Sequence, residues 1–228
     1  YKNLYYDPDN TYSIPYMFGM VGVIYNSGIV SEEDIGSWDL MWNEKYKGKI
    51  LQFNNPRDAF GTAMYWQGID VNTEDTALWE AALAKLQQQK PLVQSYVMDE
   101  IFNKMKNGSA AVAAYYAGDF LTMYESNDML GFYYPVEGTN EYVDAMCIPT
   151  CARNPEIAEL YIDFLCSEDA AVANAVWNNQ IDGASGTLFV RKCSIKECLR
   201  FKVRSNGQSE LGQYTQDAVN PHNGIMTY

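Results

Sequence analysis

Short apolar runs bounded by Gly, Pro, Asn and Asp recur along the chain, and they predict buried strands. These runs lie at residues 20–26, 49–53, 110–116, 131–135 and 145–148. The stretches between them carry apolar side chains three or four residues apart, which is the pattern of an amphipathic helix. They lie at residues 31–42, 59–67, 78–86 and 99–106, with a further helix from residue 154. Strands that alternate with helices indicate an α/β fold with largely parallel sheets.

Two helix starts are marked by residues that favour the first turn of a helix. Asn72 or Thr73 can cap the helix that carries the apolar positions 78–86, because a short polar side chain accepts a hydrogen bond from a free backbone N–H. Asn154 and Pro155 have the residue types preferred at the N-cap and at the first helical position. We therefore expect helices to begin near these two points.

Polar and aromatic residues gather where the predicted strands end. Asn55, Asp58, Tyr116 and Asp144 all lie near such ends, and Tyr142 precedes Asp144 by two residues at the entrance of the 145–148 strand. Open α/β sheets bind ligands beyond the carboxyl ends of their strands. A cation over an aromatic ring gains roughly 0.5–2 kcal/mol, depending on desolvation. These residues therefore predict a site for an organic cation.

Each of these side chains also has a purely structural interpretation. Asp144 can be a surface charge, and Asp58 can pair with Arg57 or cap the helix that follows. Tyr116 and Tyr142 can bury their rings at the edge of the core with the hydroxyl groups in water. The residues alone leave both interpretations open.

The net charge of the chain indicates which classes of ligand it is suited to bind. The 228 residues carry a formal net charge of −13, and 47% of them are hydrophobic, which is ample for a packed core. Nucleic-acid binding depends on Lys and Arg that neutralise phosphates, so we expect no nucleic-acid partner, and cationic ligands fit better. No apolar run reaches the roughly 20 residues that span a bilayer, and no secretion signal opens the sequence. We expect either a cytosolic protein or one whose leader is absent.

Metal and nucleophile chemistry have little support. The one histidine, His222, disfavours a histidine-based zinc site and a Ser/His/Asp triad. The five cysteines lack metal-ligand spacing, and we expect buried or incidental thiols at Cys147, Cys151, Cys166, Cys193 and Cys198. Phosphate-cradling loops and nucleophile elbows are also missing from the sequence. We therefore predict neither an enzyme nor a cofactor, and no metal.

The end of the chain has a different composition. From residue 177 onward there are six basic and four acidic residues, against ten basic and twenty-five acidic before it. Gly, Ser, Asn and Gln interrupt this segment without sustained periodicity. We expect residues 177–228 to form a divergent, poorly ordered tail.

Several short motifs occur together in a specific order. They are Tyr12-Ser13-Ile14-Pro15-Tyr16, Gly19, Tyr25-Asn26, Ser37-Trp38-Asp39-Leu40, Tyr46-Lys47-Gly48-Lys49-Ile50, Arg57-Asp58-Ala59-Phe60-Gly61, Glu137-Gly138-Thr139, Asp144 and Ile148-Pro149. This ordered set resembles the polyamine-binding proteins of bacterial ABC transporters, the spermidine and putrescine receptors. The resemblance implies a two-lobe, type II periplasmic-binding-protein-like fold. It also implies a polyamine ligand, delivery to ABC transporter permease subunits, a monomer, and a periplasmic protein or a cell-surface lipoprotein.

The resemblance gives each candidate residue a role. Asp144 would pair with an amine, and Tyr142 would form an aromatic wall beside it. Tyr116 stands where the family usually places tryptophan, Asp58 where glutamate is common, and Asn55 where some members have aspartate. These departures predict an altered preference for ligand length.

The resemblance also predicts how the chain is divided. Relatives carry additional residues before the first motif and a different ending, so we expect lobe two to be complete and lobe one partial. Residues 1–24 would belong to lobe one, 25–143 to lobe two, and 144–176 to the segment that returns to lobe one.

Three other functions remain open. The adjacent Tyr115 and Tyr116 resemble the phenolate pair of ferric-ion-binding proteins in the same superfamily. Asp58 and Asp144 could be the two carboxylates of a glycoside hydrolase. The chain could also bind nothing tightly if its first lobe is partial.

Overall fold

The computed structural model describes residues 4–177, 187–191, 198–203 and 209–212. The chain divides into two compact units. The continuous unit is Gly19–Tyr142, and the discontinuous unit combines Tyr1–Phe18 with Val143–Tyr228. The predicted lobe two, residues 25–143, overlaps most of the continuous unit, while the lobe boundaries of the complete fold stay a prediction.

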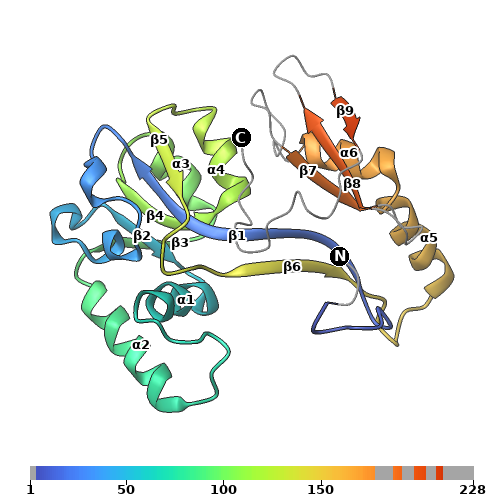
Figure 1. The fold of residues 1–228 in the computed structure, drawn as a ribbon, viewed down its shortest axis with the longest axis horizontal. Helices are drawn as coiled ribbons and strands as arrows, with labels where there is room; N and C mark the ends of the chain where they lie inside the picture. Colours follow the sequence, from blue (N-terminus) through green and yellow to red (C-terminus); the bar gives the residue numbers. More distant parts are fainter. Residues whose placement is uncertain (1–3, 178–186, 192–197, 204–208, 213–228) are drawn as a thin grey trace. The chain divides into compact units, whose positions relative to one another are not determined.

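A six-stranded sheet with helices beside it confirms the predicted α/β class (Figure 1). Its strands follow the order β3-β2-β4-β1-β5, and β6 also pairs with β1. The elements as far as the sixth strand are β1 (Ile14–Asn26), η1 (Glu32–Asp34), η2 (Trp38–Trp42), η3 (Glu44–Tyr46), β2 (Ile50–Phe53), α1 (Pro56–Trp66), α2 (Thr76–Gln89), β3 (Val93–Val97), α3 (Glu100–Lys106), β4 (Val112–Tyr116), α4 (Ala117–Tyr124), β5 (Leu130–Tyr133) and β6 (Glu141–Met146).

The sheet is mixed, so the prediction of a largely parallel sheet was only partly right. β2 runs parallel to both β3 and β4, whereas β1 runs antiparallel to β4 and β5. An apolar run reports burial and carries no information on strand direction, which explains the difference. The parallel strands bring the carboxyl ends of β2 and β4 to the same edge of the sheet, where Asn55 and Tyr116 lie.

The core of the continuous unit gathers around β2 and β4. All four residues of β2 are buried, and so are the first four of β4. The 3₁₀ helix η2 packs on β4 and buries Trp38, Leu40 and Met41. The hydrophobic effect, roughly 25 cal/mol per Å² of apolar surface removed from water, therefore acts most strongly at the centre of the sheet.

The predicted helix at residues 31–42 is interrupted in the structure. Two 3₁₀ helices, η1 and η2, replace it, and Gly36 between them has a φ of +110°. This region of backbone space favours glycine and ends a right-handed helix. Ser37 then starts η2, because its hydroxyl accepts a hydrogen bond from the backbone N–H of Asp39 at 3.0 Å.

The cap of α2 also differs from the prediction. Asp75 caps this helix by accepting a hydrogen bond from the N–H of Ala77 at 2.9 Å. Asn72 and Thr73 form the preceding turn instead, where the Thr73 hydroxyl accepts from the N–H of Asp75. Several helix-capping residue types in succession made the start of this helix ambiguous in the sequence.

A buried polar network links β2 to α1 and α2. The Gln52 amide donates to the Gln89 side chain at 3.0 Å and to the Thr62 hydroxyl at 3.2 Å. Gln89 in turn donates to the backbone carbonyl of Met41 at 2.9 Å, and Gln52 accepts from the N–H of Phe53 at 2.8 Å. Gln52 and Gln89 are fully buried, so these bonds satisfy polar groups that water cannot reach.

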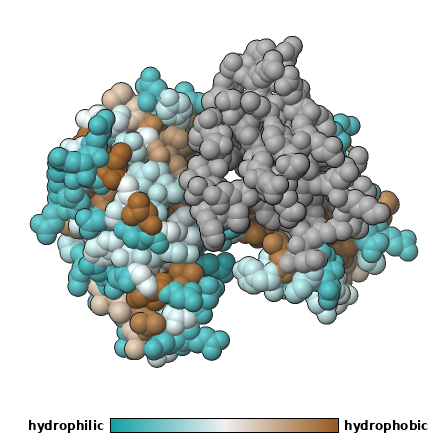
Figure 2. All heavy atoms as spheres, viewed as in Figure 1, coloured by the Kyte–Doolittle hydropathy of each residue, from teal (hydrophilic) through white to brown (hydrophobic). Residues whose placement is uncertain are grey.

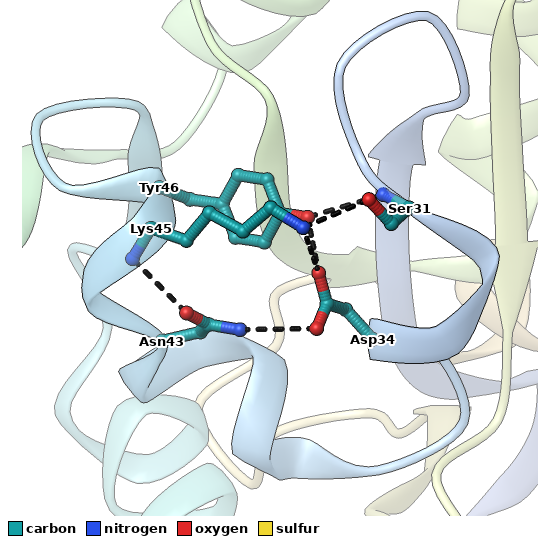
Figure 3. Close-up of polar contacts among 5 residues, drawn as sticks. All are labelled: Ser31, Asp34, Asn43, Lys45 and Tyr46. Atoms are coloured by element: carbon teal, nitrogen blue, oxygen red, sulfur yellow. Dashed lines mark hydrogen bonds and ion pairs between the residues drawn. The ribbon is translucent and has the colours of Figure 1, made fainter.

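A second polar network joins η1 to η3 at the surface (Figure 3). Asp34 accepts hydrogen bonds from the Tyr46 hydroxyl at 2.5 Å and the Lys45 ammonium at 2.9 Å. Ser31 and Asn43 complete the group, with Ser31 accepting from Lys45 at 2.8 Å. The Tyr46 hydroxyl and then the Lys45 ammonium hold the pKa of Asp34 below its ordinary value of 3.8.

This lowered pKa predicts how the network responds to acid. The Asp34 carboxylate contributes stability above its unfolded pKa of 3.8, and this contribution is lost as pH falls through the lower folded pKa. We therefore expect Asp34→Asn to be less stable than the wild type at neutral pH, with the gap closing in strong acid. Chemical unfolding at both pH values measures the gap. The matched control is Asp39→Asn at an exposed carboxylate on η2, and a gap for Asp34→Asn that persists in strong acid would contradict the expectation.

In the discontinuous unit, α5 (Pro155–Leu165) and α6 (Glu168–Trp177) precede a three-stranded antiparallel sheet of β7 (Thr187–Arg191), β8 (Cys198–Val203) and β9 (Ser209–Gly212). Asn174 on α6 donates to the hydroxyl of Tyr16 on β1. As predicted, α5 begins at Pro155, directly after Asn154. The expected tail at 177–228 thus includes the end of α6 and three strands, and its other residues, Cys193 and His222 among them, lie outside the described ranges.

The polarity of the surface differs between the continuous unit and helix α5. Hydrophilic residues cover most of the visible face of the continuous unit, interrupted by separate hydrophobic patches (Figure 2). On α5 the exposed apolar side chains lie three or four residues apart, at Ile157, Leu160, Tyr161 and Phe164, which are 60–69% exposed. Within the described ranges, no helix is long and apolar enough to cross a membrane.

Candidate functional site

The carboxylate of Asp58 lies in the first turn of α1, just beyond the carboxyl end of β2. Asn55 caps this helix by accepting a hydrogen bond from the N–H of Arg57 at 3.0 Å, and Pro56 occupies the first helical position. The free N–H groups and the dipole of a helix start stabilise a negative charge. Asp58 is nevertheless only 8% exposed. A buried carboxylate requires hydrogen-bond donors around it.

Three side chains supply these donors from different parts of the sequence. Asp58 Oδ2 accepts from the Tyr116 hydroxyl at 2.7 Å and from Asn55 Nδ2 at 2.8 Å. Asp58 Oδ1 accepts from Asn140 Nδ2 at 3.3 Å. We call Asp58, Asn55, Tyr116 and Asn140 the Asp58 cluster, and all four belong to the continuous unit.

Asn140 was not among the predicted site residues. It lies in a turn directly before β6, where its backbone carbonyl accepts from the N–H of Val21 at 3.0 Å. Its amide fits beside α1 because residue 61 is glycine, and a Cβ at Gly61 would lie 2.4 Å from Asn140 Nδ2. The sequence signals for this contact were a glycine on the helix that carries Asp58 and a polar residue just before a strand. Both features are too common to identify Asn140 as a site residue.

Aromatic rings form the border of the Asp58 cluster. The Tyr116 ring contacts Phe53 at a centroid distance of 5.3 Å and meets Tyr142 edge-on at 5.2 Å with an interplanar angle of 72°. Tyr142 approaches β1 closely where that strand has a glycine, since a Cβ at Gly19 would lie 2.4 Å from the Tyr142 hydroxyl. We call Tyr116 and Tyr142 the aromatic corner. Ring faces beside a carboxylate suit an organic cation.

Burial disfavours the charged form of the two adjacent tyrosines. Burial raises the pKa of Tyr115, with the charge of Asp119 adding to the effect. Burial also raises the pKa of Tyr116, and the hydrogen bond to Asp58 raises it further. Tyr115 is 2% exposed and packs between the rings of Phe53 and Phe102. Phenolate ligation of a ferric ion by this pair is therefore not favoured.

Four of the five predicted residues contact one another in the structure, either directly or through Tyr116. Asn55, Asp58, Tyr116 and Tyr142 lie in the continuous unit, whereas Asp144 belongs to the discontinuous unit. Asp144 is exposed in the interior of β6 rather than at the entrance of a strand, because this strand spans Glu141–Met146 instead of 145–148. Its role as the partner of an amine stays a prediction.

The structure also tests the two structural interpretations of Asp58, namely an ion pair with Arg57 and a cap of the following helix. Asp58 and Arg57, both within the described residues, form no ion pair with each other. Asn55 is the cap of α1, which leaves the Asp58 carboxylate for the Asp58 cluster. The Asp58 side chain therefore acts in the cluster rather than as a surface ion pair or a helix cap.

The described part of the chain contains no group of three or more His, Cys, Asp or Glu side chains arranged to hold a metal ion. Of the cysteines in that part, Cys147 and Cys151 are exposed thiols and Cys166 is buried. The site residues thus offer hydrogen-bond acceptors and ring faces. This arrangement can bind a cation without catalysing a reaction.

Comparison with known proteins gives a family. The sequence pattern of the family described as "Bacterial extracellular solute-binding protein" matches residues 2–180. The spermidine/putrescine-binding periplasmic protein of Escherichia coli is 30% identical over 166 residues, which cover 73% of this chain and 48% of that protein. The putrescine/cadaverine-binding protein of Pseudomonas aeruginosa is 27% identical and covers 70% of this chain and 49% of that protein.

Solved structures agree with the sequence comparison. A putative spermidine/putrescine ABC transporter protein from Listeria monocytogenes superposes with a TM-score of 0.74 at 30% identity, over 78% of this chain and 55% of that one. A spermidine/putrescine ABC transporter substrate-binding protein from Streptococcus pneumoniae superposes with a TM-score of 0.66 at 31% identity, over 77% and 54%. The chain thus spans about half the length of the relatives that it matches.

Proposed function

The chain belongs to the family of bacterial extracellular solute-binding proteins, and we propose that it captures a polyamine, spermidine or putrescine, for delivery to an ABC transporter. The observation that carries this proposal is the buried Asp58 carboxylate, which lies behind the aromatic corner of Tyr116 and Tyr142. The named functions of the relatives support it, since they are spermidine/putrescine- and putrescine/cadaverine-binding proteins.

The proposed site divides the ligand between two kinds of contact. Ring faces of Tyr116 and Tyr142 pack along the methylene groups, because a polyamine is apolar between its charged ends. Asp58, assisted by Asn55, accepts hydrogen bonds at one ammonium group, and Asp144 pairs with an amine as well. The contact to Asp58 also gains from the lower dielectric around this buried carboxylate.

The proposed partners and location follow from the family. We propose permease subunits of an ABC transporter as the protein partner, and a monomeric receptor. The location would be the periplasm, as the name of the Escherichia coli relative states, or the cell surface through a lipid anchor, since one structural relative is a lipoprotein of Treponema pallidum. The relatives are solute-binding proteins rather than enzymes, and we propose no catalysis for this chain.

Calorimetric titration with putrescine and spermidine tests the proposal. We expect saturable binding by the 228-residue chain, with Asp144→Ala weakening the affinity at least about tenfold, because an ammonium loses a charged partner worth roughly 1.5–3 kcal/mol. The matched control is Asp163→Ala, which removes the same charge from an exposed position on α5 in the same unit. Binding of neither ligand contradicts the proposed function. Equal losses in the two variants contradict the role of Asp144.

A further inference from the structure

The carboxylate of Asp58 has few acceptor positions left for a ligand. An ionised carboxylate accepts through about four lone-pair sites. Oδ2 already accepts from Tyr116 at 2.7 Å and from Asn55 at 2.8 Å, and Oδ1 accepts from Asn140 at 3.3 Å. One acceptor position therefore remains, and it is on Oδ1.

The hydroxyl of Tyr116 supplies a second acceptor. The Tyr116 hydroxyl donates its hydrogen to Oδ2 of Asp58. Burial and this hydrogen bond raise the pKa of Tyr116, so the phenol keeps that proton. Its oxygen is also approached by Asn55 and retains a lone pair for another donor. The remaining acceptors thus belong to two different side chains.

We propose that the Asp58 end of the site selects a primary ammonium group over a guanidinium group. This inference rests on the proposed function and names the kind of amine that the site takes. An ammonium has three N–H donors that point in different directions, and it can bond to Asp58 Oδ1 and to the Tyr116 oxygen separately. A guanidinium binds a carboxylate most strongly through two parallel N–H donors, which take up both oxygens of that carboxylate. Asp58 cannot provide both, because Oδ2 is occupied twice.

The packing around the Asp58 cluster keeps these donors in place. The Asn140 amide packs closely on α1, since a Cβ at Gly61 would lie 2.4 Å from its Nδ2, and it donates to Oδ1, whereas Tyr116 donates to Oδ2. Asp58 itself is only 8% exposed, and an ammonium is a more compact group than a planar guanidinium. Selectivity at this position is therefore set by three protein donors, Tyr116, Asn55 and Asn140.

Two ligands with the same four-carbon chain test the inference, namely putrescine and 1,4-diguanidinobutane. In calorimetric titrations of the full chain, we expect putrescine to bind at least about tenfold more tightly, which corresponds to about 1.4 kcal/mol. Tyr116→Phe keeps the ring but releases one lone pair of Oδ2 and removes the phenolic acceptor. We expect this variant to reduce the affinity ratio about tenfold, because the pair of carboxylate oxygens becomes available.

Tyr133→Phe is the matched control. It removes a half-buried hydroxyl of the same unit that donates to the Ser37 carbonyl at 2.8 Å and has no part in the Asp58 cluster. We expect its affinity ratio to equal that of the wild type. Equal affinities for the two ligands in the wild type, or an unchanged ratio in Tyr116→Phe, would overturn the inference. Binding of neither ligand would instead contradict the proposed function.

Discussion

Asp58→Ala is expected to weaken polyamine binding by about a hundredfold or more. Truncating one member of a buried, hydrogen-bonded charge pair costs roughly 2–5 kcal/mol. The same change also removes the acceptor of Tyr116, Asn55 and Asn140. We therefore expect a loss of stability as well, of about 2–4 kcal/mol, because the donors lose a charged partner.

Two measurements separate these effects of Asp58→Ala. Calorimetry at a temperature where the variant is folded gives the affinity, and denaturant unfolding gives the free energy of unfolding. Asp128→Ala is the control, since it removes the same charge from an exposed loop before β5. Unchanged affinity in folded Asp58→Ala would show that ligand recognition does not involve the Asp58 cluster.

Gln89→Leu should have the largest effect on stability outside the site. Leucine has a similar size, but it leaves the Met41 carbonyl without the Gln89 amide and removes one acceptor of Gln52. Each buried polar group left without its partner costs about 1–3 kcal/mol, so we expect a total loss of about 2–5 kcal/mol. Chemical unfolding followed by far-ultraviolet circular dichroism measures this loss.

Gln88→Leu is the matched control for Gln89→Leu. It introduces the same substitution one residue earlier on α2, at an exposed position. Exposed substitutions usually change stability by less than about 0.5 kcal/mol. If the two variants unfold alike, the buried network does not contribute to the stability of the continuous unit.

The sequence was most informative where burial and local capping act together. The apolar runs at β2 and β4 and the Asn154-Pro155 start of α5 were predicted correctly. The rule that parallel strands share a ligand-binding edge brought Asn55, Asp58 and Tyr116 together, and the structure places them within hydrogen-bond distance. For these elements, local pattern and tertiary structure favour the same arrangement.

Among the elements that the sequence did not predict, β3 and α4 were missed because their local signals are weak. β3 lies at the edge of the sheet and is mostly half-buried, so it lacks a continuous apolar run. α4 begins directly after Tyr116 without a side-chain cap, and its sequence therefore reads as a continuation of β4. Edge strands and uncapped helices depend on tertiary packing more than on local preference.

Contacts between distant residues limited the prediction of the site. Asn140 joins Asp58 only because Gly61 leaves room for its amide, and no pattern within either segment reports that approach. The interrupted helix at residues 31–42 has a more local cause, since Gly36 alone breaks the period. Apolar spacing identified the elements, whereas these exceptions came from single backbone positions.

The Asp58 cluster also has a consequence for folding. Its bonds close large loops, because Tyr116 and Asn140 are 58 and 82 residues from Asp58 in the sequence. Closing such loops costs chain entropy before the contacts can repay it, which delays their formation relative to local helices. A partly folded chain can therefore contain α1 and its cap while the carboxylate still lacks its distant donors. The cluster is therefore complete only after the chain has reached its native topology.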